Sequence, residues 1–307
     1  MAEKRASLSS LFLNKLSGAE LEHMRRLEAI QQAHQGRPFY VDDDNLRMMY
    51  LNPKCMQSVM KLDAPNELVC AYSRTVMGFL LFHPRPSHIL LIGLGGGSLV
   101  KYCYHHLPDC RITALEINAD VIAMREQFML PADDERLHII QCDAISHLQQ
   151  HAYAADVILL DAYDENGLVA ALNTAEFYAN CQRQLATDGV LVANVWGKPS
   201  ALADMLGRLR QVFKQQVCWS RSEDSYNLIV FAVKGSAIPR AHTGEHPALQ
   251  LEALAARLLS LDPTTSFEQV DEELHALKQS LAGIMVADNK VPQTYADWKK
   301  RVTQQQL

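Results

Sequence analysis

The chain has 307 residues and a formal net charge of −6; 48% of its residues are hydrophobic and 21% are charged. These proportions exclude a collagen-like or intrinsically disordered chain and predict a soluble globular protein, with about two domains or one large α/β domain with additions. The seven cysteines are scattered and contain no C-x-x-C pair, so neither a disulfide framework nor a clustered zinc site is expected. We therefore expect a reducing, cytoplasmic compartment.

Charge and hydropathy also narrow the choice of partner. No stretch approaches the roughly 18 apolar residues of a membrane span, and the N-terminus lacks the apolar core of a signal peptide. No run of Lys and Arg is longer than those at 25–26 and 299–301, and the chain as a whole is mildly acidic. We therefore expect no membrane or nucleic-acid partner and predict a small-molecule ligand.

The N-terminal region predicts a helix and then short strands. One helical stripe within residues 20–33 holds four apolar side chains: Leu21, Met24, Leu27 and Ile30. Residues 39–52 and 58–63 are apolar segments joined by turn residues, which predict a small β segment. Residues 66–82 then predict a helix that leads into the next strand.

Strand-length apolar runs alternate with helix-length stretches between residues 88 and 234. The expected parallel strands are ILLIG, RITALEI, LHIIQC, ADVILLD and GVLVANV, followed by the antiparallel hairpin VCWS and NLIVFAVK. Such alternation is typical of βαβ units around a parallel sheet, and right-handed crossovers make the sheet doubly wound. We predict an α/β fold with a doubly wound, mainly parallel, Rossmann-like sheet.

Residues after Gly235 predict a linker and then helices with leucine-rich stripes. These helices can cover the sheet domain or a second copy of the chain, which leaves a homodimer open. We expect four regions along the chain: an N-terminal helical extension (1–36), a small β segment with a connecting helix (37–84), a Rossmann-like nucleoside-binding transferase domain (85–235), and a linker with C-terminal helices (236–307).

Two candidate ligand-binding features follow the first two strands of the expected sheet. Gly93, Gly95 and Gly97 form a turn before a helix, where a ligand can lie against backbone and meet free N–H groups. Glu116 ends the next strand, where a carboxylate can accept both hydroxyls of a ribose. A structural tight turn and a solvated loop charge are the alternative interpretations.

Two further features follow later strands. Asp143 can accept from an exocyclic amine such as adenine N6 while Ala144 leaves room for the ring, and a helix N-cap is the alternative role of Asp143. Asp161 and Asp164 follow ADVILL, at the edge where open α/β sheets bind ligands. Two such carboxylates suit an amine substrate, because one can remove a proton while the other holds a cation.

With these motifs the chain resembles the polyamine aminopropyltransferases, of which spermidine synthase is the type. The resemblance runs from about Phe39 to Lys234 through SVMKLD, ILLIGLGGGSL, ALEINADVI, CDAISHL, DVILLDAYD and LNTAEFYANCQRQLATDGVLVAN. It implies a transferase of polyamine biosynthesis that aminopropylates a small-molecule amine. Its co-substrate would be S-adenosylmethionine or the decarboxylated form, with no metal.

The resemblance also implies residue roles. Glu116 corresponds to the residue that holds the ribose, and Asp143 to the one at the adenine. Asp161 corresponds to the residue that deprotonates the attacking amine. Asp164, with Tyr72, corresponds to residues that help to hold the amine.

Several positions depart from the family pattern. Gly96 stands where the family has an Asp that binds the ammonium of the decarboxylated donor, and Tyr72–Arg74 replaces Tyr-His-Glu. Glu165 replaces a Pro, and we find no counterpart to the Gln that contacts the ligand. Loss of charge-assisted contacts to a cation predicts an altered donor preference. It also predicts poor use of putrescine, which Arg74 would repel if it faced the site.

Two other functions remain alternatives. A methyltransferase that uses S-adenosylmethionine has the same fold, although Leu91 stands where its glycine motif often carries an acid. A nucleoside-binding interaction protein without turnover is the second alternative, and the presence of both Asp161 and Asp164 counts against it.

Overall fold

The fold is taken from a computed structural model, which describes residues 18–83, 85–164, 167–196, 199–214, 216–222 and 227–235. The linker and helices expected at 236–307 lie outside the described residues. Within the described ranges, no helix combines the length and apolarity needed to cross a membrane.

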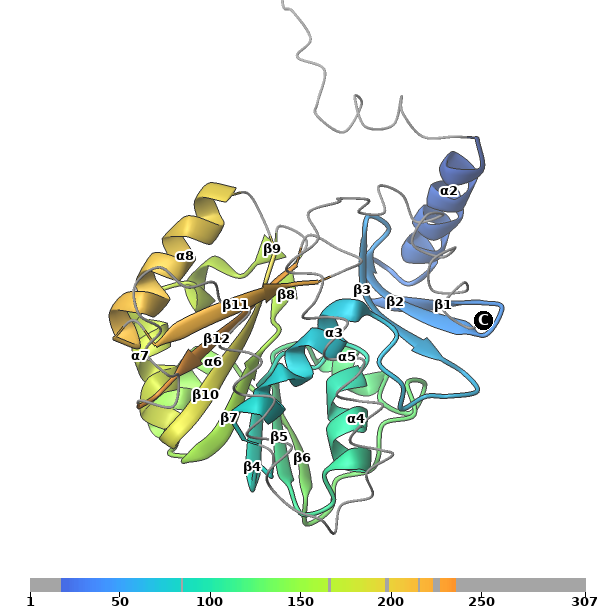
Figure 1. The fold of residues 1–307 in the computed structure, drawn as a ribbon. Coiled ribbons are helices and arrows are strands. Elements are labelled where there is room, and N and C mark those ends of the chain that lie inside the picture. Colours follow the sequence, from blue (N-terminus) through green and yellow to red (C-terminus); the bar gives the residue numbers. More distant parts are fainter. Residues whose placement is uncertain are drawn as a thin grey trace, which may run out of the picture.

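A seven-stranded sheet forms the centre of the molecule, in the order β11-β12-β10-β7-β4-β5-β6 (Figure 1). Its strands are β4 (His88–Ile92), β5 (Arg111–Glu116), β6 (Leu137–Gln141), β7 (Ala155–Leu160), β10 (Leu185–Val195), β11 (Val217–Arg221) and β12 (Leu228–Val233). Strands β4, β5, β6, β7 and β10 pair in parallel, while β12 pairs antiparallel with β10 and β11. This confirms the predicted doubly wound sheet with its closing hairpin.

The chain order reverses between β4 and β7, because β5 and β6 extend the sheet from β4 in one direction and β7 and β10 extend it in the other. Open α/β sheets bind ligands at this kind of switch point, beyond the carboxyl ends of the strands. The loops after β4 and β7 are therefore where the site is to be sought.

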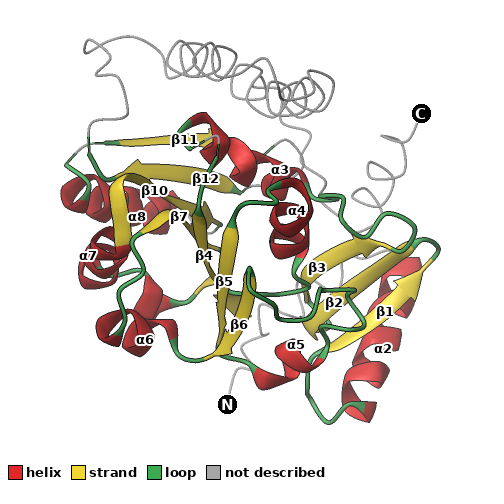
Figure 2. Ribbon diagram, turned by 90° about the horizontal axis from the view of Figure 1, so that it is seen from below, coloured by secondary structure: helices red, strands yellow, loops and turns green. Residues whose placement is uncertain are grey.

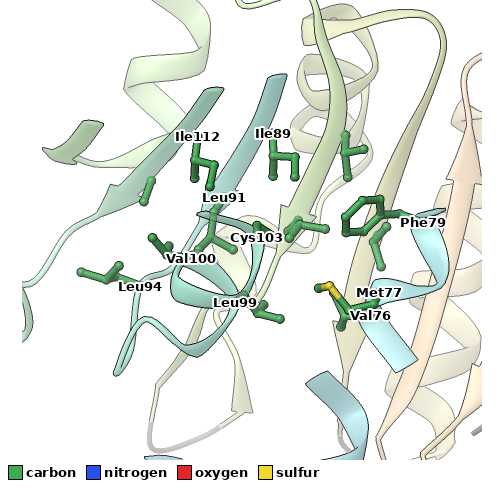
Figure 3. Close-up of a cluster of buried hydrophobic side chains, with 14 of the residues drawn as sticks. Val76, Met77, Phe79, Ile89, Leu91, Leu94, Leu99, Val100, Cys103 and Ile112 are labelled. Atoms are coloured by element: carbon green, nitrogen blue, oxygen red, sulfur yellow. The ribbon is translucent and has the colours of Figure 1, made fainter. Parts of the chain in front are cut away.

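Two hydrophobic layers cover the faces of the sheet. One face packs against α3 (Ala71–Val76), the 3₁₀ helix η1 (Met77–Leu81), α4 (Ser98–His106) and α5 (Ala119–Ala123), as Figure 3 shows in part. The other face packs against α6 (Ala144–Gln150), α7 (Ala175–Gln184) and α8 (Pro199–Val212). Along the fully buried β4, Ile89 and Leu91 join the first layer, while Leu90 and Ile92 join the second. Burial on both faces explains why this strand is a continuous apolar run.

The N-terminal residues form a second, smaller sheet. Strands β1 (Phe39–Asp43), β2 (Leu46–Asn52) and β3 (Cys55–Lys61) pair antiparallel, and α2 (Gly18–Ala33) covers them with Leu27, which is 1% exposed. Figure 2 shows this sheet beside α4, and Lys101 of α4 donates to the Met60 sulfur of β3. The predicted helix and β segment are confirmed, and β3 lies next to the glycine turn.

Some elements differ from the predictions. The helix expected from residue 66 begins at Ala71 and continues as the 3₁₀ helix η1. The helix-length stretch between the second and third strands is a regular helix only in α5. Beyond it, Leu130 N–H bonds the Arg125 carbonyl and Met129 N–H bonds that of Glu126, with Met129 at a φ of 54°. This is the bonding pattern of a helix C-terminus, so a turn near residue 129 ends the segment.

Candidate active site

The glycine turn lies directly against the end of β7. Gly93 has a φ of +94°, and a Cβ there would lie 2.3 Å from the Asp161 carbonyl oxygen. Asp161 N–H also donates to the Ile92 carbonyl at 2.9 Å. A side chain at position 93 would separate the two strand ends, so this glycine lets the structure bring the turn and Asp161 together.

Gly97 has a structural reason of its own. It is the N-cap of α4, with a φ of +67°, and a Cβ would lie 2.4 Å from Leu130 Cδ2. Gly95 lies next to β3, with the Gln57 carbonyl 4.0 Å from its Cβ position. The tight-turn interpretation therefore holds for part of the motif, and it is compatible with a ligand against the same backbone.

Glu116 is bound to the glycine turn rather than solvated. Its side chain is buried, Oε2 accepts from Leu94 N–H at 2.8 Å, and Oε1 accepts from Asn118 N–H at 2.9 Å. Since a carboxylate has about four acceptor positions, each oxygen keeps capacity for another donor. This carboxylate fixes the turn and is able to receive ribose hydroxyls as well.

Asp143 is the N-cap of α6, which is the alternative role that the sequence analysis gave it. The carboxylate accepts from the N–H groups of Ile145 and Ser146 at 3.1 and 3.3 Å, and from the Ser146 hydroxyl at 2.7 Å. The Ser146 hydroxyl and the backbone bonds lower the pKa of Asp143 from its usual value, against an opposing effect of burial. Ala144 is buried directly after the cap. A charged acceptor therefore stands at the end of β6.

Asp161 is held by side chains from other elements. Asn194 of β10 donates from Nδ2 to Oδ1 at 2.8 Å, and the Tyr72 hydroxyl of α3 donates to Oδ2 at 3.4 Å. Burial raises the pKa of Asp161, and these two hydrogen bonds partly offset the effect. A carboxylate with a raised pKa is a stronger proton acceptor once ionised, as a general base requires.

Two tyrosine hydroxyls next to this carboxylate stay neutral. Burial, reinforced by the charge of Asp161, raises the pKa of Tyr72 well above its ordinary value and that of Tyr163 in the same direction. The Tyr163 hydroxyl donates to the Asn194 carbonyl at 2.5 Å and accepts from Trp196 N–H at 2.8 Å. Both tyrosines therefore act as hydrogen-bond donors here.

The second carboxylate of the motif is placed only by its backbone. Asp164 lies in β8 (Tyr163–Asp164), paired with Gly167 of β9 (Gly167–Leu168), a short hairpin that the sequence analysis did not predict. The Asp164 side chain and Glu165 lie outside what the structure describes. The role of Asp164 stays a prediction.

Ser73 and Arg74 are bound to local backbone. The Ser73 hydroxyl donates to the Cys70 carbonyl at 2.6 Å, and Arg74 Nη1 donates to the carbonyls of Leu68 and Val69, both at 2.9 Å. The guanidinium thus holds the segment before α3. Repulsion of a cationic amine by Arg74, which depended on that side chain facing the site, has no support in these contacts.

The space beside Gly96 is already filled. A Cβ there would lie 2.7 Å from the Ser58 hydroxyl of β3 and 2.8 Å from the Phe128 ring. The Ser58 hydroxyl also lies 3.4 Å from that of Ser98. An acid at position 96 would need both neighbours to shift, so the departure at Gly96 is coupled to residues far away in sequence.

The sequence analysis missed four residues near the carboxyl ends of the strands. Asn194 and Asn227 bond in series to Asp161, and no local motif signals them. The Gln57 carbonyl of β3 lies beside the glycine turn, at a register shift in the β2–β3 pairing, although we had found no glutamine counterpart from the sequence. Ile117, 69% exposed directly after Glu116, offers an apolar surface, and its signal was the isoleucine that follows the strand-end acid.

Comparisons with known proteins match this part of the chain to one family. A family model described as the spermine/spermidine synthase domain matches residues 69–229. A polyamine aminopropyltransferase of Neisseria meningitidis is 38% identical over 197 residues, which are 64% of this chain and 75% of that protein. One from Chromobacterium violaceum is 35% identical over 241 residues, 78% of this chain and 88% of that protein.

A solved structure agrees at the level of the fold. The crystal structure of a probable spermidine synthase from Corynebacterium glutamicum has a TM-score of 0.59 against this chain, at 19% identity. The match covers 71% of this chain and 82% of that one. Within the described residues there is no group of three or more His, Cys, Asp or Glu side chains placed to hold a metal ion.

Proposed function

Because this chain belongs to the spermine/spermidine synthase family of transferases, we propose that it transfers an aminopropyl group from an S-adenosyl nucleoside to a small-molecule amine. The observation that carries the proposal is the Asp161 carboxylate, bonded by Asn194 and Tyr72 and adjoining the glycine turn. A base at this point lies between the two substrates that such a reaction must join.

Asp161 is proposed as the general base. The amine nitrogen attacks the carbon bonded to the donor sulfonium, the C–N bond forms while the C–S bond breaks, and the electron pair returns to sulfur. The surplus proton on nitrogen passes to Asp161, whose pKa burial has raised. Because the sulfonium is already a good leaving group, the protein's work is to orient the amine and take its proton.

The nucleoside is proposed to bind across β4, β5 and β6. The backbone of Gly93, Gly95 and Gly97 would lie along the donor, Glu116 would hold the ribose, and Asp143 with Ala144 would meet the adenine. Support comes from the burial and bonding of Glu116 beside the turn and from the exposed Ile117 next to it. In this proposal the transferase domain (85–235) binds the nucleoside.

The amine is proposed to bind at Asp161 with Asp164 and Tyr72, so that residues of the 37–84 segment complete its site. Tyr72 supports this role, because its hydroxyl is directed at Asp161 from α3. We also propose a cytoplasmic location, because the seven cysteines are scattered along the chain and contain no C-x-x-C pair.

Methyl transfer from S-adenosylmethionine is the second candidate, and Gly96 favours it. The Ser58 hydroxyl and the Phe128 ring occupy the space that a side chain at position 96 would need, so an acid for the ammonium of a decarboxylated donor is missing there. The two reactions differ in by-product. Aminopropyl transfer releases methylthioadenosine, and methyl transfer releases S-adenosylhomocysteine.

The by-product decides between the candidates. The purified protein is incubated with putrescine, spermidine or a monoamine, together with decarboxylated or intact S-adenosylmethionine, and the nucleoside released is identified by mass spectrometry. Methylthioadenosine release that depends on amine and is lost in Asp161→Asn supports the proposal. S-adenosylhomocysteine would support methyl transfer, and nucleoside binding without either product would support an interaction protein.

The donor preference is tested by placing an acid at position 96 while the neighbouring Ser58 side chain is removed. Gly96→Asp alone should unfold at lower temperature, because its side chain meets Ser58 and Phe128. Gly96→Asp combined with Ser58→Gly leaves only the Phe128 ring to shift, so the double variant should be more stable than Gly96→Asp alone. It should bind the decarboxylated donor about 10-fold more tightly relative to S-adenosylmethionine. Ser58→Gly alone is the control, and an unchanged preference in the double variant would contradict the assignment of this position.

A further inference from the structure

Two asparagine amides connect the β11–β12 hairpin to Asp161. Asn227, directly before β12, donates from Nδ2 to Asn194 Oδ1 at 2.7 Å. Asn194 in turn donates from Nδ2 to Asp161 Oδ1 at 2.8 Å. Asn194 is buried and Asn227 is half-buried, so water has little access to the chain of bonds.

The direction of these bonds depends on the charge of Asp161. An ionised carboxylate can only accept, so Asn194 has to present its NH₂ group to it. With the amide in that orientation, Asn194 Oδ1 faces the NH₂ group of Asn227. While Asn227 keeps its NH₂ group toward Asn194, as observed, turning the Asn194 amide over would set two NH₂ groups against each other and an oxygen against the carboxylate. Asn227 therefore favours the one orientation that suits ionised Asp161.

The backbone keeps both amides in place. Asn194 pairs with Ile229 across β10 and β12, and its carbonyl accepts from the Tyr163 hydroxyl. Ser222 N–H donates to the Asn227 carbonyl at 3.0 Å and closes the hairpin. The amide groups can rotate, but they cannot move apart without opening the sheet edge.

Among the described side chains, the other titratable groups at Asp161 are Tyr72 from α3, Tyr163 from β8, and the Cys70 thiol beside Tyr72. Burial raises the pKa of both tyrosines, so their hydroxyls remain protonated while Asp161 titrates. A change in the titration of Asp161 after substitution of an asparagine therefore reports on the amides.

We propose that Asn227 is a positioning residue, which acts through the Asn194 amide to hold Asp161 in the ionised, proton-accepting form. The role of that form in deprotonating an amine rests on the proposed function. The effect on Asp161 itself does not, since it follows from the hydrogen bonds.

The test measures the titration of Asp161 directly. Protein labelled with ¹³C in the Asp carboxyl groups is titrated by NMR, and Asp161→Asn assigns the resonance. The Asp161 midpoint should rise by about one pH unit in Asn194→Ala, because a bond to the charged form is lost, and by roughly half of that in Asn227→Ala. Asn45→Ala, at the distant β1–β2 turn, is the matched control and should not move it.

A double variant separates action through Asn194 from any independent effect. In Asn194→Ala/Asn227→Ala the midpoint should equal that of Asn194→Ala alone, because the intermediary is absent. An unchanged midpoint in Asn227→Ala, or additive shifts in the double variant, would overturn the inference. Far-ultraviolet circular dichroism and methylthioadenosine binding check the folding of each variant. If Asn227→Ala does not fold, Asn227→Leu, which is similar in shape and has no donor, takes its place with the same expected shift.

Activity provides an independent second readout. Where the wild-type protein alkylates an amine, the acid limb of its kcat/KM profile should move to higher pH in parallel with the NMR midpoint, while the rate at high pH is largely kept. If the midpoint moves as expected but no amine is alkylated by the wild type, the proposed function fails and the inference about Asn227 stands.

Discussion

The carboxylates on the two sides of the switch point are held in different ways. On the β5–β6 side, Glu116 and Asp143 accept mainly from backbone N–H groups of neighbouring loops and helix starts. On the β7 side, Asp161 accepts from the side chains of Tyr72 and Asn194, which are 89 and 33 residues away in sequence. Backbone donors come with the fold, whereas side-chain donors require particular residues. The β5–β6 side, the nucleoside side of the proposed function, should therefore be the more tolerant of sequence change.

The largest expected effect is at Asp161, and it tests the β7 side of this comparison. Asp161→Asn should lower kcat by about 10²- to 10⁴-fold, because an amide cannot accept the proton of the amine. Affinity for methylthioadenosine, measured by calorimetry, should change little, since the nucleoside side is bonded separately. Asp204→Asn, an exposed change of the same kind in α8, is the control. A nucleoside affinity that falls as much as kcat would show that the two sides are not independent.

Lys101 is a buried cation in α4, the helix that follows the glycine turn. Its side chain is 1% exposed, Nζ donates to the Phe128 carbonyl at 2.7 Å, and burial lowers its pKa to about 8. The folded pKa lies below the unfolded value of about 10.4, so the unfolded state binds more protons between these two values. The charge of Lys101 therefore lowers the free energy of unfolding at low pH, and this destabilisation fades as pH rises from 8 toward 10.

Lys101→Met should remove that pH dependence. Between pH 7.5 and 10, the free energy of unfolding of the wild type should rise by about 2 kcal/mol relative to the variant, as measured by urea denaturation. The comparison between variants cancels the titration of other groups. If the free energy of unfolding depends on pH in the same way in both proteins, burial does not lower the pKa of Lys101.

Glu116 tests the nucleoside side. Glu116→Ala should weaken methylthioadenosine binding by about 10- to 100-fold, through the loss of charge-assisted bonds to the ribose. It should also lower stability, because the N–H groups of Leu94 and Asn118 lose their acceptor. Calorimetry and thermal unfolding measure the two effects, and a stability loss without any loss of affinity would leave Glu116 as a purely structural residue.

The same contrast explains what could be predicted from sequence. Period and alternation predicted the strands of the α/β domain and their doubly wound, mainly parallel arrangement, which the sheet confirms. The family comparison confirms the predicted resemblance and a transferase. Glu116, Asp143 and Asp161 were predicted as site residues because each follows a strand, at the edge where open α/β sheets bind ligands. Their roles stay predictions.

The asparagines that bond in series to Asp161 could not be predicted from strand-end position. Asn194 lies within the buried strand GVLVANV and Asn227 precedes a second one, and neither shows its function until β10 and β12 are paired. The crowding at Gly96 depends on Ser58 and Phe128, which come from separate elements. Such residues become visible only through long-range contacts, which local patterns do not encode.

The smallest expected effect is at Asp143, where capping and adenine binding can be separated. Asp143→Ala should cost about 1 kcal/mol of unfolding free energy at pH 7, as loss of an N-cap does, while Asp143→Asn should keep most of it. Because the hydrogen bond from Ser146 lowers the folded pKa of Asp143, the carboxylate's stabilisation is present above its unfolded pKa of about 4 and is lost as pH falls through the folded one. The penalty of Asp143→Ala in urea denaturation should thus shrink as pH falls below about 4. If methylthioadenosine affinity is the same in both variants and the wild type, the cap is the whole role of Asp143; a loss in the Ala variant greater than its thermal destabilisation explains would instead support contact with the adenine.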